Sequence, residues 1–165
     1  MSYIIRAATS KDIPAILEIV NDAISNTTAI YDYNPRTHEM QQQWLEDKTN
    51  NNFPVIVAEQ NGEVTGYGTF GTFREKAAYH LTVEHSVYVK SGFSGRGIGS
   101  KLLSKLIVIA KAKNLHVMIG AIDADNKESI DFHKKFGFTE CGIIRQVGFK
   151  FDRWLDLMLM QLILE

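Results

Sequence analysis

The sequence contains one cysteine, three prolines, and no apolar run long enough to cross a membrane. A single cysteine, Cys141, excludes an internal disulfide framework. Eighteen Lys and Arg residues nearly balance nineteen Asp and Glu, for a net charge of −1. Because no basic run stands out, nucleic acid is not expected as a partner. The five histidines have no metal-ligand spacing, so we expect no metal site.

The beginning of the chain, Met-Ser-Tyr-Ile-Ile-Arg, is not typical of a signal peptide. With no membrane span and no signal peptide expected, a cytoplasmic protein is the simplest interpretation. The 165 residues are 45% hydrophobic and contain no internal repeat or linker. This length and composition favour one compact domain over residues 1–165.

Four glycines crowd the segment between an apparent strand and an apparent helix. Residues 85–89 are β-branched and aromatic, which is typical of a strand. After the glycines, apolar residues recur at helical spacing. A glycine loop that opens a helix presents unpaired N–H groups and the positive end of the helix dipole, which favours a bound phosphate. The glycines are Gly92, Gly95, Gly97 and Gly99, and the apolar positions are Leu102, Leu103, Leu106, Ile107 and Ala110.

The glycine loop has three possible interpretations. A P-loop needs Lys and then Ser or Thr after its last glycine, but Ile98 follows Gly97, so that pattern is excluded. The dinucleotide fingerprint has wider spacing than Gly95-x-Gly97-x-Gly99 and lies near the start of a fold. A dehydrogenase stays open as an outside alternative because Asp123 follows the next strand. A glycine-rich turn without any ligand is the third interpretation.

The order of predicted elements indicates an α/β fold with a mixed central sheet. Asn61-Gly62 predicts a hairpin turn. Residues 26–35 either line a pocket or form a surface connection, and the sequence alone favours the surface connection. Asp125 and Glu128 are expected to form a capping box, and Asp152-Arg153 a turn. The predicted strands are 3–6, 55–58, 64–73, 79–89, 115–122, 146–151 and 154–164; helices are expected from Thr9, from Thr37, after Gly99 and over 126–136.

Two groups of polar residues are candidates for chemistry. Asn126, Ser129 and His133 fall on one face of a predicted helix, which is either a solvated face or a site. Glu84 precedes the strand 85–89 and is either a solvent-facing edge residue or a base. A reaction at an amine needs a base, because amines are largely protonated at pH 7.

Several motifs resemble those of the GNAT superfamily of N-acetyltransferases. Ser94-Gly95-Arg96-Gly97-Ile98-Gly99 is similar to the acyl-CoA motif Gln/Arg-x-x-Gly-x-Gly/Ala, although Ser94 departs from its first position. Residues 126–138 are similar to the second motif, Asn-x-x-Ser-x-x-x-His-x-x-x-Gly-Phe. Further marks resemble the phosphinothricin and methionine sulfoximine acetyltransferase branch, and these are residues 26–29, 71–74, 84–89 and 147–156.

The resemblance implies a GNAT-like mixed central β-sheet flanked by helices. Its parts would be an antiparallel meander, a parallel crossover at the acyl-CoA site and a C-terminal antiparallel pair. It also implies transfer of acetyl from acetyl-CoA to the α-amino group of small amino-acid-like substrates such as phosphinothricin, methionine sulfoximine or methionine sulfone. Direct attack in a ternary complex, a role in detoxification and a homodimer are implied as well.

The resemblance also assigns roles to residues. Glu84 would be the catalytic base, and His133 would either protonate the leaving thiolate or only contact CoA. Arg74 would bind an acidic headgroup, with help from Lys76. The cofactor-binding residues would be Val87, Tyr88, Val89, Gly95, Arg96, Gly97, Ile98, Gly99, Ser100, Asn126 and Ser129. The substrate-binding residues would be Phe73, Arg74, Glu75, Lys76, Glu84, His85 and Ser86.

Two other functions remain open on the same fold. The acceptor is alternatively a protein N-terminus or a polyamine, which an open groove would favour. The chain is alternatively a CoA-binding module without catalysis, which binding without turnover would reveal.

Overall fold

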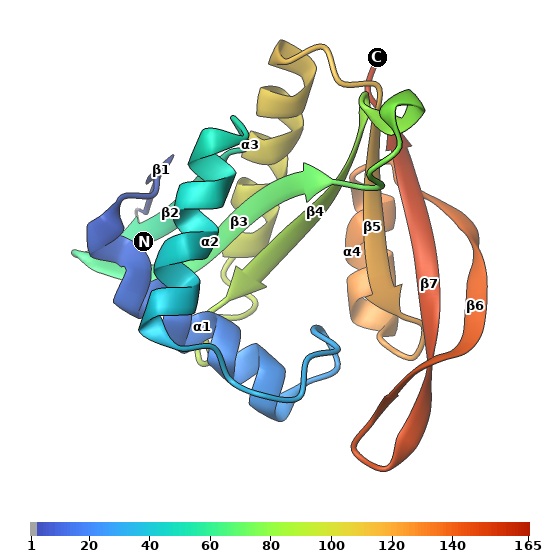
Figure 1. Ribbon diagram of the computed structural model, residues 1–165, viewed down its shortest axis with the longest axis horizontal. Helices are drawn as coiled ribbons and strands as arrows, with labels where there is room; N and C mark the ends of the chain where they lie inside the picture. Colours follow the sequence, from blue (N-terminus) through green and yellow to red (C-terminus); the bar gives the residue numbers. More distant parts are fainter. Residues whose placement is uncertain (1–2) are drawn as a thin grey trace.

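A computed structural model describes residues 3–165 as a seven-stranded sheet with helices on both faces (Figure 1). Met1 and Ser2 belong to the N-terminal segment for which no signal peptide is expected, and they lie outside the described residues. The strands are β1 (Ile4–Ala7), β2 (Val55–Gln60), β3 (Glu63–Thr72), β4 (Thr82–Val89), β5 (Val117–Asp123), β6 (Thr139–Lys150) and β7 (Arg153–Ile163). The helices are α1 (Ile13–Asn26), α2 (His38–Asn50), α3 (Ile98–Ala112) and α4 (Lys127–Lys135), with short 3₁₀ turns at Ser10–Asp12 and Ala77–Tyr79.

The sheet has the order β1-β2-β3-β4-β5-β7-β6, and only its β4–β5 pair is parallel. The other neighbours are antiparallel, so the predicted mixed sheet is confirmed. Helices α1 and α2 pack on one face and α3 and α4 on the other (Figure 1). Each face buries its own apolar cluster, one around Ile16, Val20 and Tyr67 and the other around Leu102 and Leu106.

The parallel pair separates shortly after it forms. Thr82–Glu84 pair with Val117–Ile119, but β4 continues to Val89 and β5 to Asp123. In Figure 1 the two strands start side by side and diverge toward their carboxyl ends. The backbone of residues 85–89 therefore has a sheet partner on the β3 side alone. A ligand can enter between the strands, and Glu84 stands where they part.

Local signals predicted several boundaries correctly. Thr37 caps α2 by accepting a hydrogen bond from the Met40 N–H at 3.2 Å. Asn61 and Gly62 form the β2–β3 turn with φ values of 52° and 81°. The expected capping box of Asp125 and Glu128 is wrong, because Asn126 caps α4 and accepts from the Ser129 N–H at 3.0 Å.

The C-terminal hairpin is longer than predicted. β6 begins at Thr139 rather than at 146, and the turn lies at Phe151 and Asp152, whose φ values are 54° and 55°. The register shifts twice along β6, and Gln146 has a φ of 51°. These irregularities interrupt the two-residue alternation by which a strand is recognised in a sequence. The strand predicted at 79–89 begins later than expected, at Thr82, because residues 77–79 form a 3₁₀ turn.

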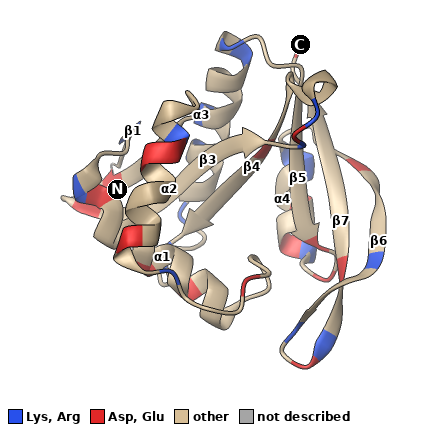
Figure 2. Ribbon diagram, viewed as in Figure 1, with Lys and Arg blue, Asp and Glu red and all other residues tan. Residues whose placement is uncertain are grey.

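Charged residues of both signs are scattered over the helices and the β6–β7 hairpin (Figure 2). Within residues 3–165 we find no helix with both the length and the apolar character that a membrane crossing requires. In the same part of the chain, His, Cys, Asp and Glu side chains do not gather in groups of three that would hold a metal ion.

Candidate active site

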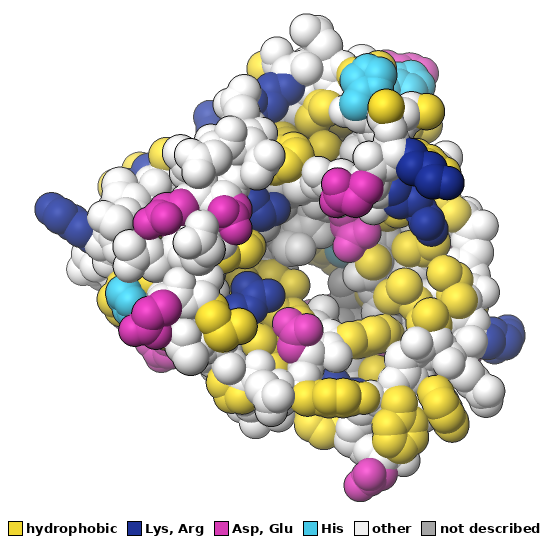
Figure 3. Space-filling view, in the orientation of Figure 1, with side chains coloured by type: hydrophobic (Ala, Val, Ile, Leu, Met, Phe, Trp, Pro, Cys, Tyr) yellow, Lys and Arg dark blue, Asp and Glu magenta, His cyan; other side chains and the backbone are white. Residues whose placement is uncertain are grey.

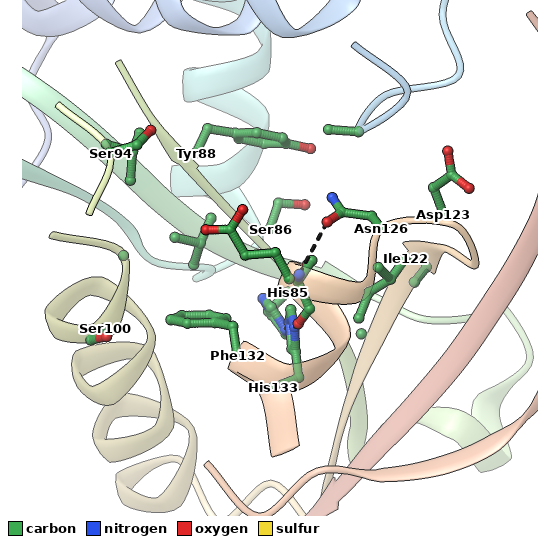
Figure 4. A pocket seen from close by; sticks show the side chains of 18 of the residues that line it. His85, Ser86, Tyr88, Ser94, Ser100, Ile122, Asp123, Asn126, Phe132 and His133 are labelled. Carbon is green, nitrogen blue, oxygen red and sulfur yellow. Dashed lines mark hydrogen bonds between the residues drawn. The ribbon is translucent and has the colours of Figure 1, made fainter. Parts of the chain in front are cut away.

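A cavity of about 720 Å³ lies where β4 and β5 diverge. The molecule is hollowed near the centre of the face shown in Figure 3, between the N-terminal helices and the β6–β7 side. Figure 4 shows Ser94 and Ser100 at one end of the cavity, Asp123 at the opposite end, and His85 beside His133 between them. Most predicted site residues line it: Glu84, His85, Ser86, Val87, Tyr88, Val89, Gly95, Gly97, Ile98, Gly99, Ser100, Asn126, Ser129 and His133.

The glycine loop has the backbone that a diphosphate requires. Gly95 and Gly97 have φ values of 76° and 78°, where glycine is the favoured residue, and Gly97 is the N-cap of α3. In α3 the Lys101 N–H donates to the Gly97 carbonyl at 3.1 Å. The N–H groups of Ile98, Gly99 and Ser100 therefore lie at the free positive end of the helix. These donors fit the pyrophosphate of a CoA-type molecule.

Side chains of β4 alternate between the two faces of the sheet. Tyr88 packs with the cluster under α1 and α2, whereas Val87 and Val89 pack with the cluster under α3 and α4. By the same alternation, Glu84 and Ser86 face the α1–α2 side and His85 faces α4. The strand thus presents a carboxylate on one side of the cavity and an imidazole on the other.

Burial and a nearby cation act on the Glu84 carboxyl in opposite directions. It is half-buried at the point where β4 and β5 separate. Burial raises the pKa of its carboxyl, and the positive charge of Lys48 on α2 opposes this rise. A carboxylate with a raised pKa binds a proton more readily, while the nearby cation favours its ionised form. Glu84 is therefore suited to accept a proton from a bound ammonium group.

His85 and His133 form a buried pair whose Nε2 atoms are 3.0 Å apart. The Nδ1 atom of His133 is 2.6 Å from the Ser129 carbonyl and must donate to it. His133 Nε2 therefore accepts from His85 Nε2–H, and His85 Nδ1 is left as a buried acceptor without a partner among the described residues. Gly120 on β5 makes room for both rings, since an added Cβ would lie 3.3 Å from His133 and 3.4 Å from His85.

Both histidines are neutral at physiological pH. They are only 7% and 6% exposed. Burial lowers the pKa of His85 to about 3, with His133 adding to the effect, and burial also lowers the pKa of His133. Since both ring nitrogens of His133 already have partners, no N–H of this ring is free to protonate a thiolate. Proton donation by His133 stays a prediction, and this geometry supports CoA contact better.

The histidine pair makes the fold sensitive to acid. Below about pH 6.5 the histidines of the unfolded chain bind protons, whereas the buried pair does not. Stability is therefore greatest above pH 6.5 and falls as the pH drops toward the lowered folded-state values. From pH 7 to pH 5.5 we expect the free energy of unfolding to fall by about 1 kcal/mol through His85, with a further fall through His133, measured by urea titration. A His85→Asn variant is expected to have a smaller pH dependence, and an unchanged slope would contradict the assignment.

The other end of the cavity is formed by a segment for which the sequence favoured a surface connection over a pocket lining. Thr28, Ala29 and Tyr31 line the cavity, so the expectation that residues 26–35 are a plain surface connection is wrong. Thr28 Oγ1 donates to the buried Asp123 carboxylate, which joins this loop to the end of β5. The Tyr31 hydroxyl is buried and has no partner among the described residues. This end offers polar groups to an acceptor molecule.

A lysine of the C-terminal hairpin holds the same loop. Lys150 is 4% exposed, and its ammonium donates to the carbonyls of Ile24, Thr27 and Ile30 at 2.6, 2.8 and 2.7 Å. Three short bonds use all three donors of the ammonium. No local pattern indicated this contact, because the partners are more than a hundred positions apart in the chain.

Five predicted site residues do not line the cavity. Arg96 is exposed, donates to the Gly92 carbonyl at 3.2 Å and lies over the Phe93 ring. The other four form the loop after β3 and are Phe73, Arg74, Glu75 and Lys76. Arg74 is exposed and lies 5.3 Å from the Phe73 ring centre. This loop begins near the position on β3 that pairs with Glu84, so it stands outside the cavity at the same end of the strand.

Comparison with known proteins gives a consistent result. A family model described as Acetyltransferase (GNAT) domain matches residues 5–159. An L-methionine sulfoximine/L-methionine sulfone acetyltransferase of Pseudomonas aeruginosa is 45% identical over the whole of this chain and 96% of its own.

Solved structures resemble the chain equally well. An N-acetyltransferase of Staphylococcus aureus Mu50 has a TM-score of 0.98 and 48% identity, with full coverage of both chains. A GNAT superfamily phosphinothricin acetyltransferase of Sinorhizobium meliloti, in complex with AcCoA, has a TM-score of 0.95 and 34% identity, covering 99% of this chain and 89% of its own.

Proposed function

Because the chain belongs to the GNAT family of acetyltransferases, we propose that it transfers the acetyl group of acetyl-CoA to the α-amino group of small amino-acid-like substrates. Methionine sulfoximine, methionine sulfone and phosphinothricin are the substrates named for similar proteins. The observation that carries the proposal is the position of Glu84. It stands where β4 and β5 separate, beside a cavity whose other end holds a helix N-terminus suited to a diphosphate.

The proposed mechanism is direct attack of the amine, without a covalent enzyme intermediate. When bound, acetyl-CoA would supply a thioester whose C–S bond is replaced by a C–N bond to the amine, and CoA would leave as the thiol with the second proton that the nitrogen loses. The N–H groups of Ile98 to Ser100 hold the diphosphate, and the unpaired edge of residues 87–89 holds the acyl end. Glu84 removes the proton that the ammonium must lose before attack.

Other site residues have supporting roles in this proposal. Asn126 and Ser129 contact the pantetheine arm from α4. Of the two roles predicted for His133, contact with CoA is the one we propose, because its ring nitrogens bond to Ser129 and His85. Arg74 remains the proposed partner of an acidic headgroup, reached from the loop outside the cavity.

A thiol-release assay tests the function. Purified protein is incubated with acetyl-CoA and a panel holding methionine sulfoximine, methionine sulfone, phosphinothricin, a polyamine and a peptide N-terminus. We expect turnover on the first three alone. Turnover confined to the polyamine or the peptide would overturn the substrate class. CoA binding without any turnover would identify a non-catalytic module instead.

We also propose a domain organisation, a biological role and a location for the protein. Residues 1–165 act as a single N-acetyltransferase domain, and acetylation of such analogues would serve detoxification. We place the protein in the cytoplasm, where a free exposed thiol such as Cys141 stays reduced.

We also propose that the protein is a homodimer that buries the outer face of the β6–β7 hairpin. Apolar side chains gather over this hairpin in Figure 3. A contiguous apolar surface of this kind is typical of a protein–protein interface. The exposed apolar residues there are Ile143, Ile144, Val147, Phe149, Phe151 and Trp154.

Charge on this surface is expected to separate the subunits. Trp154 is 60% exposed on the hairpin, and Val108 is 58% exposed on α3. We expect light scattering after gel filtration to give a dimer mass for the natural chain and a monomer mass for Trp154→Glu, because burying a carboxylate in an apolar contact is costly. Val108→Glu is the matched control and should remain dimeric. A monomeric natural chain would refute the homodimer.

A further inference from the structure

Lys48 is a half-buried lysine on an otherwise polar and largely exposed helix, α2. Its Nζ donates to the Phe70 carbonyl at 3.0 Å and lies 5.9 and 5.5 Å from the ring centres of Trp44 and Phe53. Burial lowers the pKa of Lys48 to about 8, and the charge of Glu84 acts in the opposite direction. A partly desolvated ammonium is costly, so its place on the Glu84 side of the sheet calls for a physical reason.

Gly71 makes the space that this ammonium occupies. On β3, Gly71 pairs with Glu84 of β4, so a side chain at 71 would stand beside Glu84 on the same face. A Cβ added at Gly71 would lie 2.6 Å from Lys48 Nζ. The backbone there has no positive φ, so the glycine is needed for room rather than for conformation. The Lys48 ammonium therefore occupies the space beside Glu84 that a side chain at position 71 would otherwise fill.

Lys48 is the cation placed to act on Glu84, because its Nζ lies beside Gly71, the cross-strand partner of Glu84. The residues opposite Glu84 on the two adjoining strands are Gly71 on β3 and Ile119 on β5, and neither carries charge. Tyr88 faces the same side, and the pKa of its hydroxyl is raised chiefly by its own burial. Burial and Lys48 are the two influences on the Glu84 pKa. His85 belongs to the opposite face.

We propose that Lys48 is a positioning residue that keeps the Glu84 carboxylate ionised without pairing with it. The Phe70 carbonyl takes one N–H of the ammonium and anchors it to the backbone of β3. A direct ion pair would occupy the carboxylate oxygens that must receive the substrate proton, and with no cation the buried carboxyl would stay protonated to higher pH. This inference rests on the proposed function, in which Glu84 is the base.

Three variants test the inference through the pH dependence of kcat/KM for the amine. Lys48→Met removes the charge, Lys48→Arg keeps it, and Gly71→Ala displaces the ammonium while retaining the lysine. Lys111→Met, at an exposed position near the end of α3, is the matched control. Because the acidic limb reports ionisation of the base in the free enzyme, Lys48→Met should shift it to higher pH. We expect kcat/KM about tenfold lower at pH 6 and within about twofold of the natural chain at pH 8.5.

The variants together distinguish a positioning role of Lys48 from a role as the base and from a role as a substrate ligand. Gly71→Ala should shift the limb in the same direction as Lys48→Met, and Lys48→Arg and Lys111→Met should leave it in place. Loss of activity in both Lys48→Arg and Lys48→Met at every pH would make Lys48 itself the base. A raised KM with an unmoved limb in Lys48→Met would make it a substrate ligand. Either result overturns the inference.

A measurement without turnover distinguishes failure of the inference from failure of the proposed function. The Glu84 carboxyl can be titrated by NMR in protein labelled with ¹³C-glutamate, with Glu84→Gln identifying its signal. If Lys48 keeps Glu84 ionised, the pH at the midpoint of the Glu84 titration should rise in Lys48→Met and stay unchanged in Lys111→Met. An unmoved midpoint overturns it whether or not the protein acetylates any amine. A natural chain that is inactive on every amine, with the midpoint moved as expected, overturns the function alone.

Discussion

Glu84→Gln is expected to lower kcat/KM for the amine by about 10² to 10⁴-fold, the usual contribution of a general base. Glutamine keeps the shape of the side chain but cannot accept the ammonium proton. Glu84 lies on the α1–α2 side of the cavity, away from the helix N-terminus that would hold the diphosphate. The dissociation constant for acetyl-CoA, measured by calorimetry, should therefore remain within about twofold of the natural value.

The pH dependence of Glu84→Gln distinguishes a base from a structural residue. At high pH a growing fraction of the amine is already neutral and needs no base. The loss of kcat/KM in Glu84→Gln should therefore become smaller toward pH 9.5 if Glu84 removes a proton. The loss should stay constant with pH if Glu84 only shapes the cavity. Glu46→Gln changes an exposed glutamate of α2 and is the control expected to keep full activity. Full activity in Glu84→Gln at pH 7 would eliminate Glu84 as the base.

Lys150→Met is expected to cost about 3 kcal/mol of folding free energy, because it leaves one buried and two partly buried carbonyls without their donor. For a chain of this size that corresponds to a fall in Tm of roughly 6 to 12 °C. Scanning calorimetry measures the change. Lys113→Met, at an exposed position after α3, should move Tm by less than about 2 °C.

The same substitution should also affect the acceptor end of the cavity. Lys150 holds the loop that contains Thr28 and Tyr31, so KM for the amine should rise while the dissociation constant for acetyl-CoA stays unchanged. Tyr33→Phe should have smaller effects on Tm and on KM for the amine than Lys150→Met. It removes only the 2.6 Å hydrogen bond from the Tyr33 hydroxyl to the Phe149 carbonyl. An unaltered Tm in Lys150→Met would show that the three bonds contribute little.

The fold could be predicted from the sequence because its main signals are local. The glycine loop, the Asn61-Gly62 turn and the apolar stripe of α3 each depend on neighbours within a few residues. Together they indicated the parallel pair and the helix that opens the phosphate site. The family motifs added Glu84 and Asn126, and the cavity does include both.

The contacts at the end of the cavity lined by Thr28 and Tyr31 could not be predicted, because residues distant in the chain make them. Thr28 meets Asp123 across the sheet, and Tyr31 packs against Gly148, where an added Cβ would lie 2.7 Å from its ring. Nothing near Thr28 in the sequence indicates either partner. The His85–His133 pair was missed for the same reason, since the two rings come from different elements and their contact needs Gly120 on a third.

The three Lys150 bonds also determine when the acceptor end can form. They join residues 126, 123 and 120 positions apart in the chain, and closing such large loops is slow because the entropy is lost before the contact is gained. During synthesis, α1 emerges from the ribosome long before residue 150. The loop with Thr28 and Tyr31 is therefore expected to be one of the last parts of the cavity to reach its final form.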